Sequence, residues 1–226
     1  MKTRIAILAT ALAVAFQTAT ALAVVITTNT ALSPADLLYD SQPIVVSNCT
    51  LTVDGVHNFA SLLLTDSAVL THSPAPAGET NNRLDLAIAG ELTIDATSSV
   101  DVNAKGYGSG AGPGAATNNM SGGGHGGPGG TAHYVPAGGV SYGDLLAPTV
   151  WGSGGGGGGA GGGWVRLGVG GVLTVAGQLT ANGESAWWSG GAGGSILVSA
   201  GTLAGAGTIS AKGGDCGYAM SGGCGG

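Results

Sequence analysis

The sequence predicts an all-β protein, a right-handed parallel β-helix interrupted by a long glycine-rich loop. Short stretches alternate apolar and polar residues with the period of two that is typical of strands. Two such blocks, 84–94 and 165–175, resemble each other, which indicates a stacked repeat. Between them, residues 106–163 hold 25 glycines in 58 residues. The alternative, a glycine-rich β-sandwich, would favour two-residue hairpin turns and aromatic core residues, whereas phenylalanine occurs only twice.

The first 23 residues are predicted to be a signal peptide. Lys2 and Arg4 give the basic start, an apolar run extends from 5 to 16, and Ala21-Leu22-Ala23 is a small-residue cleavage site. The apolar run is too short to span a membrane, which takes about 20 residues. We therefore expect an exported protein, extracellular or at the cell surface, with no membrane-spanning segment in the mature chain.

The mature chain is predicted to divide into four parts. Residues 24–43 are a lead-in that caps the N-terminal end, with a brief helical turn at 36–39. Residues 44–105 and 164–226 are the β-helix, and residues 106–163 are the glycine-rich insertion loop. Turn signals such as Asp54-Gly55 separate four short strands, expected at 44–46, 51–53, 62–64 and 69–72. Because the closing SGGCGG resembles the start of another glycine loop, the last part is expected to be truncated.

The repeat predicts which side chains are buried. Leu84, Leu86, Ile88, Leu92 and Ile94 match Val165, Leu167, Val169, Leu173 and Val175, and Gly90 matches Gly171, where a bend would separate two strands. Each block closes on a similar run, at 102–106, 179–183 and 209–213. A repeat of this kind buries its apolar face by stacking on its neighbours. We expect one continuous interior that includes Leu86, Leu92, Ile94, Leu167, Leu173, Val175, Ile196, Val198 and Ile209.

Charge is sparse, and most of it is negative. After removal of the signal peptide four basic residues face twelve acidic ones, a net charge of −8. Such a surface repels phosphate groups, which excludes nucleic acid as an expected partner. The acidic residues Asp85, Glu91, Asp95 and Asp101 fall between inward-facing apolar positions, so we expect them on a solvated face rather than paired for glycoside hydrolysis.

A family resemblance rests on two groups of residues. Leu51-Thr52-Val53-Asp54-Gly55, Ser61-Leu62-Leu63-Leu64 and Ala68-Val69-Leu70-Thr71-His72 precede the repeat; the runs 122–127, 142–144 and 152–155 lie in the glycine-rich segment. Over residues 40–226 the chain resembles secreted bacterial glycine-rich proteins of the pectin-lyase-like β-helix class. The resemblance implies export and surface display, and it carries no catalytic residue over to this chain.

Four tryptophans border glycine runs and have two interpretations. Exposed rings can stack on sugars, whereas buried rings would cover glycine backbone that has no side chain of its own. The candidates for carbohydrate contact are Trp151, Trp164, Trp187 and Trp188.

The glycine-rich segment also holds candidates for metal binding or catalysis. His125, His133 and Asp144 form a possible metal-binding set, and either histidine could activate Ser121 or Ser141 as a nucleophile. The competing interpretation is that His125 packs and hydrogen-bonds inside a compact loop. We expect no cofactor.

Three cysteines remain for an exported chain. Cys216 and Cys224 are close enough in sequence to close a small disulfide loop, which would leave Cys49 unpaired.

These features favour a non-catalytic structural or adhesive module of an exported surface protein. Its expected partners are further copies of itself or a cell-surface polysaccharide. The alternatives are a polysaccharide lyase or glycoside hydrolase of the pectin-lyase-like fold, for which Arg83 and Arg166 are the basic candidates, and a carbohydrate-binding module that uses the tryptophans.

Overall fold

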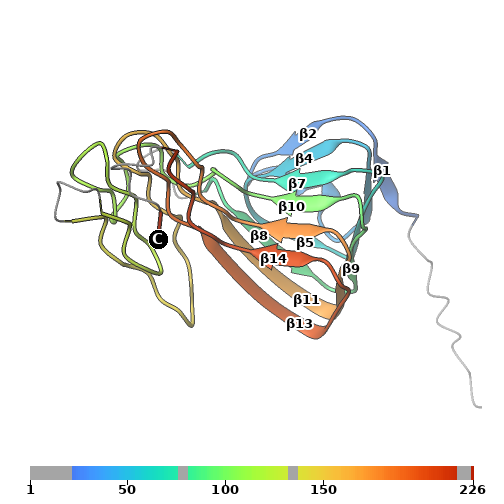
Figure 1. The fold of residues 1–226 in the computed structure, drawn as a ribbon. Coiled ribbons are helices and arrows are strands. Elements are labelled where there is room, and N and C mark those ends of the chain that lie inside the picture. Colours follow the sequence, from blue (N-terminus) through green and yellow to red (C-terminus); the bar gives the residue numbers. More distant parts are fainter. Residues whose placement is uncertain (1–21, 76–80, 132–136, 218–224) are drawn as a thin grey trace, which may run out of the picture.

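The computed structural model describes residues 22–75, 81–131, 137–217 and 225–226, so most of the predicted signal peptide lies outside it. The described residues form fourteen strands and one short 3-10 helix, Leu37–Tyr39, at the predicted helical turn. Figure 1 shows the strands at one side of the molecule and the glycine-rich segment beyond their ends at the other. The protein is all-β, as the sequence predicts.

The smaller sheet has six parallel strands. Its order is β14-β12-β10-β7-β4-β2, so that each strand lies beside the next one contributed by the chain. The strands are β2 (Thr30–Leu32), β4 (Thr50–Val53), β7 (Val69–Thr71), β10 (Ser99–Asp101), β12 (Gln178–Thr180) and β14 (Thr208–Ser210).

The larger sheet has eight parallel strands and curls into half a barrel. Its order is β1-β3-β6-β9-β11-β8-β5, with β13 paired to the other side of β11. The first half of β11 pairs with β8 and its second half with β9. The curvature of the sheet therefore passes through β11, which lies beside both strands. The strands are β1 (Val24–Ile26), β3 (Pro43–Ser47), β5 (Gly55–Phe59), β6 (Ser61–Thr65), β8 (Leu84–Ile88), β9 (Leu92–Ile94), β11 (Trp164–Val175) and β13 (Ser195–Ala204).

The predicted β-helix is wrong, and so is the alternative β-sandwich. Two parallel sheets, one curled into half a barrel, replace a stack of equivalent turns. The bend expected at Gly171 does not end a strand: β11 runs through it with only a register irregularity between Val169 and Val172. Strand β11 therefore joins two segments that were expected to be separate strands. A sandwich of antiparallel pairs is excluded because the paired strands of the described chain are parallel.

The sequence match between the two blocks nevertheless identifies strand neighbours correctly. Val165 lies opposite Leu84, Leu167 opposite Leu86 and Leu173 opposite Leu92. The closing runs are less accurate, because Leu179 pairs with Val100 rather than with Val102. A shift of two residues keeps each side chain on the same face of the sheet, so the inward and outward assignments survive.

Six of the nine predicted core residues are buried in one apolar cluster, and three are not fully buried. Ile196 and Val198 only pack against the cluster from β13, and Ile209 on β14 is 44% exposed. The prediction fails at these positions because β13 and β14 are the last strands, and no described strand lies beyond them.

The sequence analysis missed three strands. β1 and β2 lie in the predicted lead-in, and β5 begins at Gly55, where a turn was expected. Gly55 has a φ of 94°, and a Cβ there would lie 2.8 Å from the Pro34 ring. The alternation in β5 is hidden because its inward side chain at position 57 is a histidine. His57 is fully buried, with Nδ1 3.0 Å from Asp40.

The glycine-rich segment is packed, a property that the sequence left open. Residues 106–131 and 137–163, together with 182–194, make up what we call the glycine lobe. The structure assigns no strand to it, yet amides bond to carbonyls of segments distant in sequence: Gly106 N to Gly161 O (2.7 Å), Gly162 N to Ala192 O (2.9 Å) and Gly123 N to Gly190 O (3.1 Å). The lobe thus satisfies much of its own backbone.

Glycine is required in the lobe because neighbouring chain segments lie where a side chain would stand. A Cβ on Gly161 would lie 1.8 Å from the Gly152 carbonyl oxygen, and one on Gly191 would lie 1.9 Å from that of Ala160. Contacts this short cannot relax when backbone stands on both sides. By contrast, a Cβ on Gly108 meets nothing within 4 Å.

We predict that Gly161→Ala lowers the free energy of unfolding by about 2 kcal/mol or more, because the methyl group has no space. The matched change Gly108→Ala should leave it within about 1 kcal/mol of the wild type. Urea unfolding of both variants checks this, and equal stabilities would show that the lobe is loosely packed.

One histidine joins the end of β7 to the start of β11, next to the lobe. His72 is fully buried just after β7; its Nδ1 lies 2.7 Å from the Ser73 carbonyl, and its Nε2 accepts a hydrogen bond from Trp164 N at 3.1 Å. An imidazole that donates from one nitrogen and accepts at the other is neutral. Burial lowers the pKa of His72 to about 4 from its ordinary value of 6.5.

This contact predicts acid sensitivity. Between pH 6.5 and 4 the unfolded chain binds a proton at position 72 that the folded protein does not bind. The stabilising effect of the neutral ring is therefore complete above about pH 6.5 and is lost as the pH falls towards 4, a change of about 3 kcal/mol. In His72→Gln, whose amide donates and accepts without titrating, urea unfolding at pH 4.5 to 7 should show a shallower slope. An unchanged slope would contradict the assignment.

Candidate functional site

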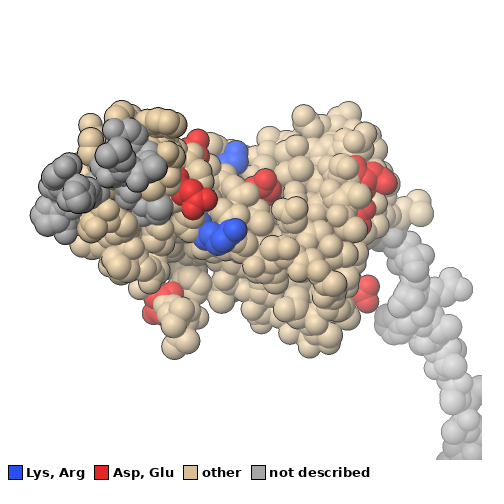
Figure 2. Space-filling view, viewed as in Figure 1, with Lys and Arg blue, Asp and Glu red and all other residues tan. Residues whose placement is uncertain are grey.

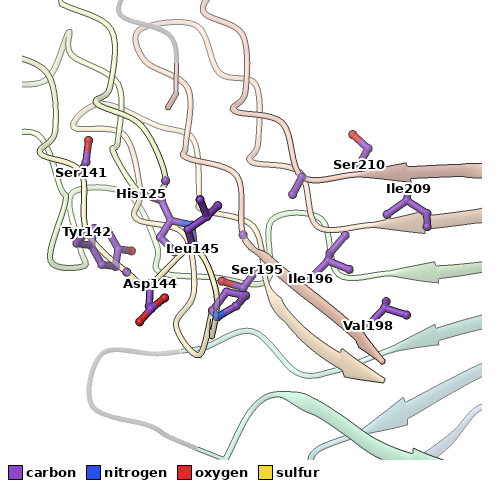
Figure 3. A pocket seen from close by; sticks show the side chains of 15 residues that line it. His125, Ser141, Tyr142, Asp144, Leu145, Ser195, Ile196, Val198, Ile209 and Ser210 are labelled. Carbon is purple, nitrogen blue, oxygen red and sulfur yellow. The ribbon is translucent and has the colours of Figure 1, made fainter. Parts of the chain in front are cut away.

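A cavity of about 690 Å³ opens where the glycine lobe meets the last strands of both sheets (Figure 3). One wall comes from the lobe, at 125–126 and within 141–148. The other wall comes from the start of β13 and the end of β14. The strand side is aliphatic, and the lobe side carries the polar groups. Its principal side chains are His125, Ser141, Tyr142, Asp144, Leu145, Pro148, Ser195, Ile196, Val198, Ile209 and Ser210.

His125 is fixed by the lobe. Its side chain is 6% exposed, and Nδ1 lies 2.8 Å from the Gly193 carbonyl oxygen. A carbonyl only accepts, so Nδ1 carries the proton and Nε2 is an acceptor in the neutral ring. Burial lowers the pKa of His125, which favours this neutral form. Gly143, with a φ of 91°, lies over Nε2; a Cβ there would be 3.2 Å from that nitrogen.

A chain of buried hydrogen bonds holds the aromatic neighbour of His125. Tyr142 lies with its ring centre 4.9 Å from that of His125. Its hydroxyl donates to the Trp151 carbonyl and accepts from Ser153 Oγ at 2.9 Å, and Ser153 Oγ accepts from Gly114 N. Burial raises the pKa of Tyr142 to about 12. The phenol is therefore a fixed wall of the cavity rather than an acid.

The lobe wall ends in an exposed arm, residues 144–148. Asp144 Oδ1 accepts hydrogen bonds from Leu146 N (2.7 Å) and Ala147 N (3.2 Å), which closes a turn. Leu145 and Leu146 are 95% and 88% exposed. At the base of the arm, Ser195 Oγ donates to the Val150 carbonyl at 2.6 Å and attaches the arm to β13.

The structure brings together two of the three predicted metal ligands. His125 and Asp144 both line the cavity, whereas His133 lies outside the described residues. Within the described ranges, no three His, Cys, Asp or Glu side chains are grouped to hold a metal ion. Of the two candidate serines, Ser141 lines the cavity and Ser121 is buried beside Asn118.

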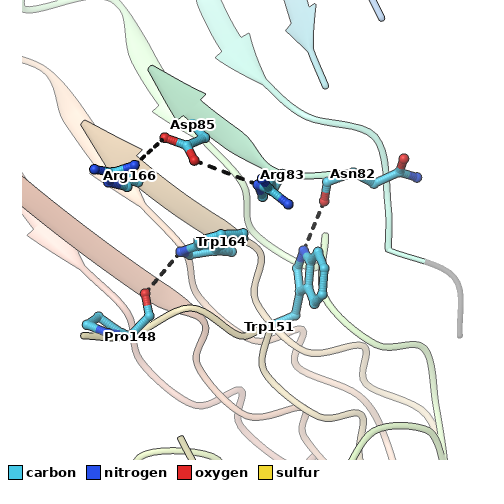
Figure 4. Close-up of polar contacts among 7 residues, drawn as sticks. All are labelled: Asn82, Arg83, Asp85, Pro148, Trp151, Trp164 and Arg166. Carbon is cyan, nitrogen blue, oxygen red and sulfur yellow. Dashed lines mark hydrogen bonds and ion pairs between the residues drawn. The ribbon is translucent and has the colours of Figure 1, made fainter. Parts of the chain in front are cut away.

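The tryptophans fall into two pairs. Trp151 and Trp164 are buried and pack edge to face at 5.9 Å; their indole nitrogens donate to the carbonyls of Asn82 (2.9 Å) and Pro148 (3.1 Å) (Figure 4). They cover backbone and do not face solvent. Trp187 and Trp188 are 63% and 41% exposed, so only this pair is placed for contact with a ligand.

The basic candidates surround a carboxylate. Arg166 lies 3.3 Å and Arg83 3.8 Å from Asp85, and Arg83 also stacks over the Trp164 ring at 4.9 Å (Figure 4). Asp85 is consequently only 6% exposed, which corrects the expectation that it lies on a solvated face. The arrangement lies at the junction between β8, β11 and the lobe.

The cysteines add no described bridge. Cys49 is buried and donates to the Ile26 carbonyl at 3.3 Å. Cys216 lies in the described chain, and Cys224 lies outside it, so the predicted disulfide stays a prediction.

The lining of the cavity carries little charge. Among the described residues that line it, Asp144 is the one carboxylate, and none is Lys or Arg. Figure 2 shows that most of the visible surface is likewise uncharged. His125 Nε2 and the Asp144 carboxylate both accept hydrogen bonds, so the site suits a ligand that donates them and disfavours anions.

The candidates named from the sequence include His125, Ser141 and Asp144 of the cavity but not its other lining residues. Ile196, Val198 and Ile209 were expected to be core, and the alternation that placed them there says nothing about the last strand of a sheet. The one sequence feature that points to Gly143 is its position between Tyr142 and the candidate residue Asp144.

No family model, curated protein or solved structure matches this chain. Among the residues that the structure describes, no helix has the length and apolar character to cross a membrane.

Proposed function

We propose that this chain is a non-catalytic structural or adhesive module of an exported protein, extracellular or at the cell surface, and that two copies associate through β13 and β14. The observation that carries the proposal is the difference between the two ends of the sheets. Export is supported by the basic start, apolar run and Ala-Leu-Ala site of residues 1–23.

The N-terminal end of the interior is closed. Ile26 on β1 and Leu32 on β2 are 6% and 3% exposed. The segment around the 3-10 helix packs onto the same core: Tyr39 lies against the apolar cluster, Pro34 lies against Gly55, and Asp40 pairs with His57. Natural sheets commonly protect an end by such a covering segment.

The opposite end is open. Leu203 lies opposite the fully buried Leu173 and so faces the interior, yet it is 57% exposed. Among the described strands, β13 pairs only with β11 and β14 only with β12, which leaves the outer backbone edge of each strand available. Residues 195–210 contain no charged residue and no proline, the usual means of blocking such an edge.

A second copy is the occupant that fits this edge. Two identical uncharged edges meet without charge repulsion, although each chain carries a net negative charge. Each supplies the same aliphatic side chains to the other across a two-fold axis, and such an interface closes at the dimer.

We expect a concentration-dependent dimer in analytical ultracentrifugation. Leu203→Lys should give a monomer, because it places a charge in the interface. The matched control is Val56→Lys, on the outer face of β5, where Val56 is 48% exposed; this variant should still dimerise. A monomeric wild type at all concentrations, or equal effects of the two lysines, would contradict the proposal.

A further inference from the structure

We propose that the cavity between the glycine lobe and β13–β14 binds one residue of a neutral carbohydrate, with His125 Nε2 accepting a hydrogen bond from a sugar hydroxyl. This inference names a ligand for the adhesive role, but it does not depend on dimer formation.

The first step is an accessible acceptor. His125 is more than nine-tenths buried as a residue, and the bond from Nδ1 to Gly193 O prevents Nε2 from taking the proton in the neutral ring. No described residue donates to Nε2. The ring lines the cavity, so a ligand hydroxyl can donate to this nitrogen.

The second step is access. Gly143 is the residue whose Cβ would stand in contact with Nε2, and its positive φ disfavours any side chain there. The nitrogen therefore stays uncovered on the cavity side. The volume of about 690 Å³ is within the usual range for small-molecule sites.

The third step is the separation of apolar and polar side chains on the two walls of the cavity. Ile196, Val198 and Ile209 provide an aliphatic surface on the strand side, and His125 and Asp144 provide acceptors on the lobe side. A pyranose ring has a matching division, with C–H groups on its faces and hydroxyl donors around its rim. Since none of the described lining residues is basic, a uronate or phosphate would lose solvation without gaining a cationic partner among them.

The test is a titration of the purified protein with glucose, galactose, mannose and N-acetylglucosamine, and with glucuronate as the anionic match for glucose. Isothermal calorimetry measures affinity, and the ¹⁵N NMR signal of His125 Nε2 reports contact at the proposed atom. We expect saturable binding of at least one neutral sugar with a shift of that signal, and at least about tenfold weaker binding of glucuronate, which corresponds to 1.4 kcal/mol.

Two variants test the role of Nε2 in different ways, one by removing this atom and the other by covering it. His125→Asn keeps an amide donor near the position of Nδ1 but lacks Nε2, and Gly143→Ala leaves His125 intact while covering Nε2. Each should weaken binding at least about tenfold. Gly127→Ala, where a Cβ meets nothing within 4 Å, should bind as the wild type does.

The outcomes separate this inference from dimer formation. Leu203 does not line the cavity, so monomeric Leu203→Lys should bind sugar at least as tightly as the wild type does. Absence of saturable binding by all four neutral sugars, equal binding of glucuronate, or wild-type affinity in folded His125→Asn and Gly143→Ala would overturn the inference.

Discussion

The close approach of glycine backbones in the lobe is the constraint on which the rest of the structure depends. Carbonyl oxygens lie about 2 Å from where the Cβ atoms of Gly129, Gly154 and Gly191 would stand. This packing holds Gly193 against His125, and it sets the arm 144–148 beside β13. A lobe of larger residues could not place its segments so close, and the cavity would have no fixed wall.

Polar contacts of buried residues connect the lobe to the sheets and hold the two parts together. His72 links the end of β7 to the first residue of β11, and Trp164 then returns a bond to Pro148 in the lobe. Asp85, held between Arg83 and Arg166, closes the same junction on the outer face. His72 and Asp85 are buried, and their contacts with Trp164 and Arg166 offset the cost of burying them. The arm therefore takes its position from the sheets as much as from the lobe.

Local patterns predicted the strands and their neighbours, and they failed where the answer depended on the whole molecule. The match of Leu86 with Leu167 came from alternation, which is a local property of a strand. Whether β11 bends at Gly171 depends on what pairs with both of its halves, and that is not encoded locally. The exposure of Ile209 depends on the absence of a described strand beyond β14. Likewise, the glycine count does not say how the segment packs, because composition does not reveal bonds such as the one between Gly123 and Gly190.

The two proposals share one surface, and this sharing couples them. Ile209 belongs both to the cavity and to the open edge. A sugar residue in the cavity and a second copy across β14 therefore compete for the same apolar atoms. Linkage requires that each lower the affinity of the other by the same factor. Saturating sugar should weaken the dimer measured by ultracentrifugation, and dimerisation should weaken sugar binding equally. In His125→Asn the dimer should persist and should no longer respond to sugar. A dimer that is strengthened by sugar would instead mean that the ligand bridges the two copies.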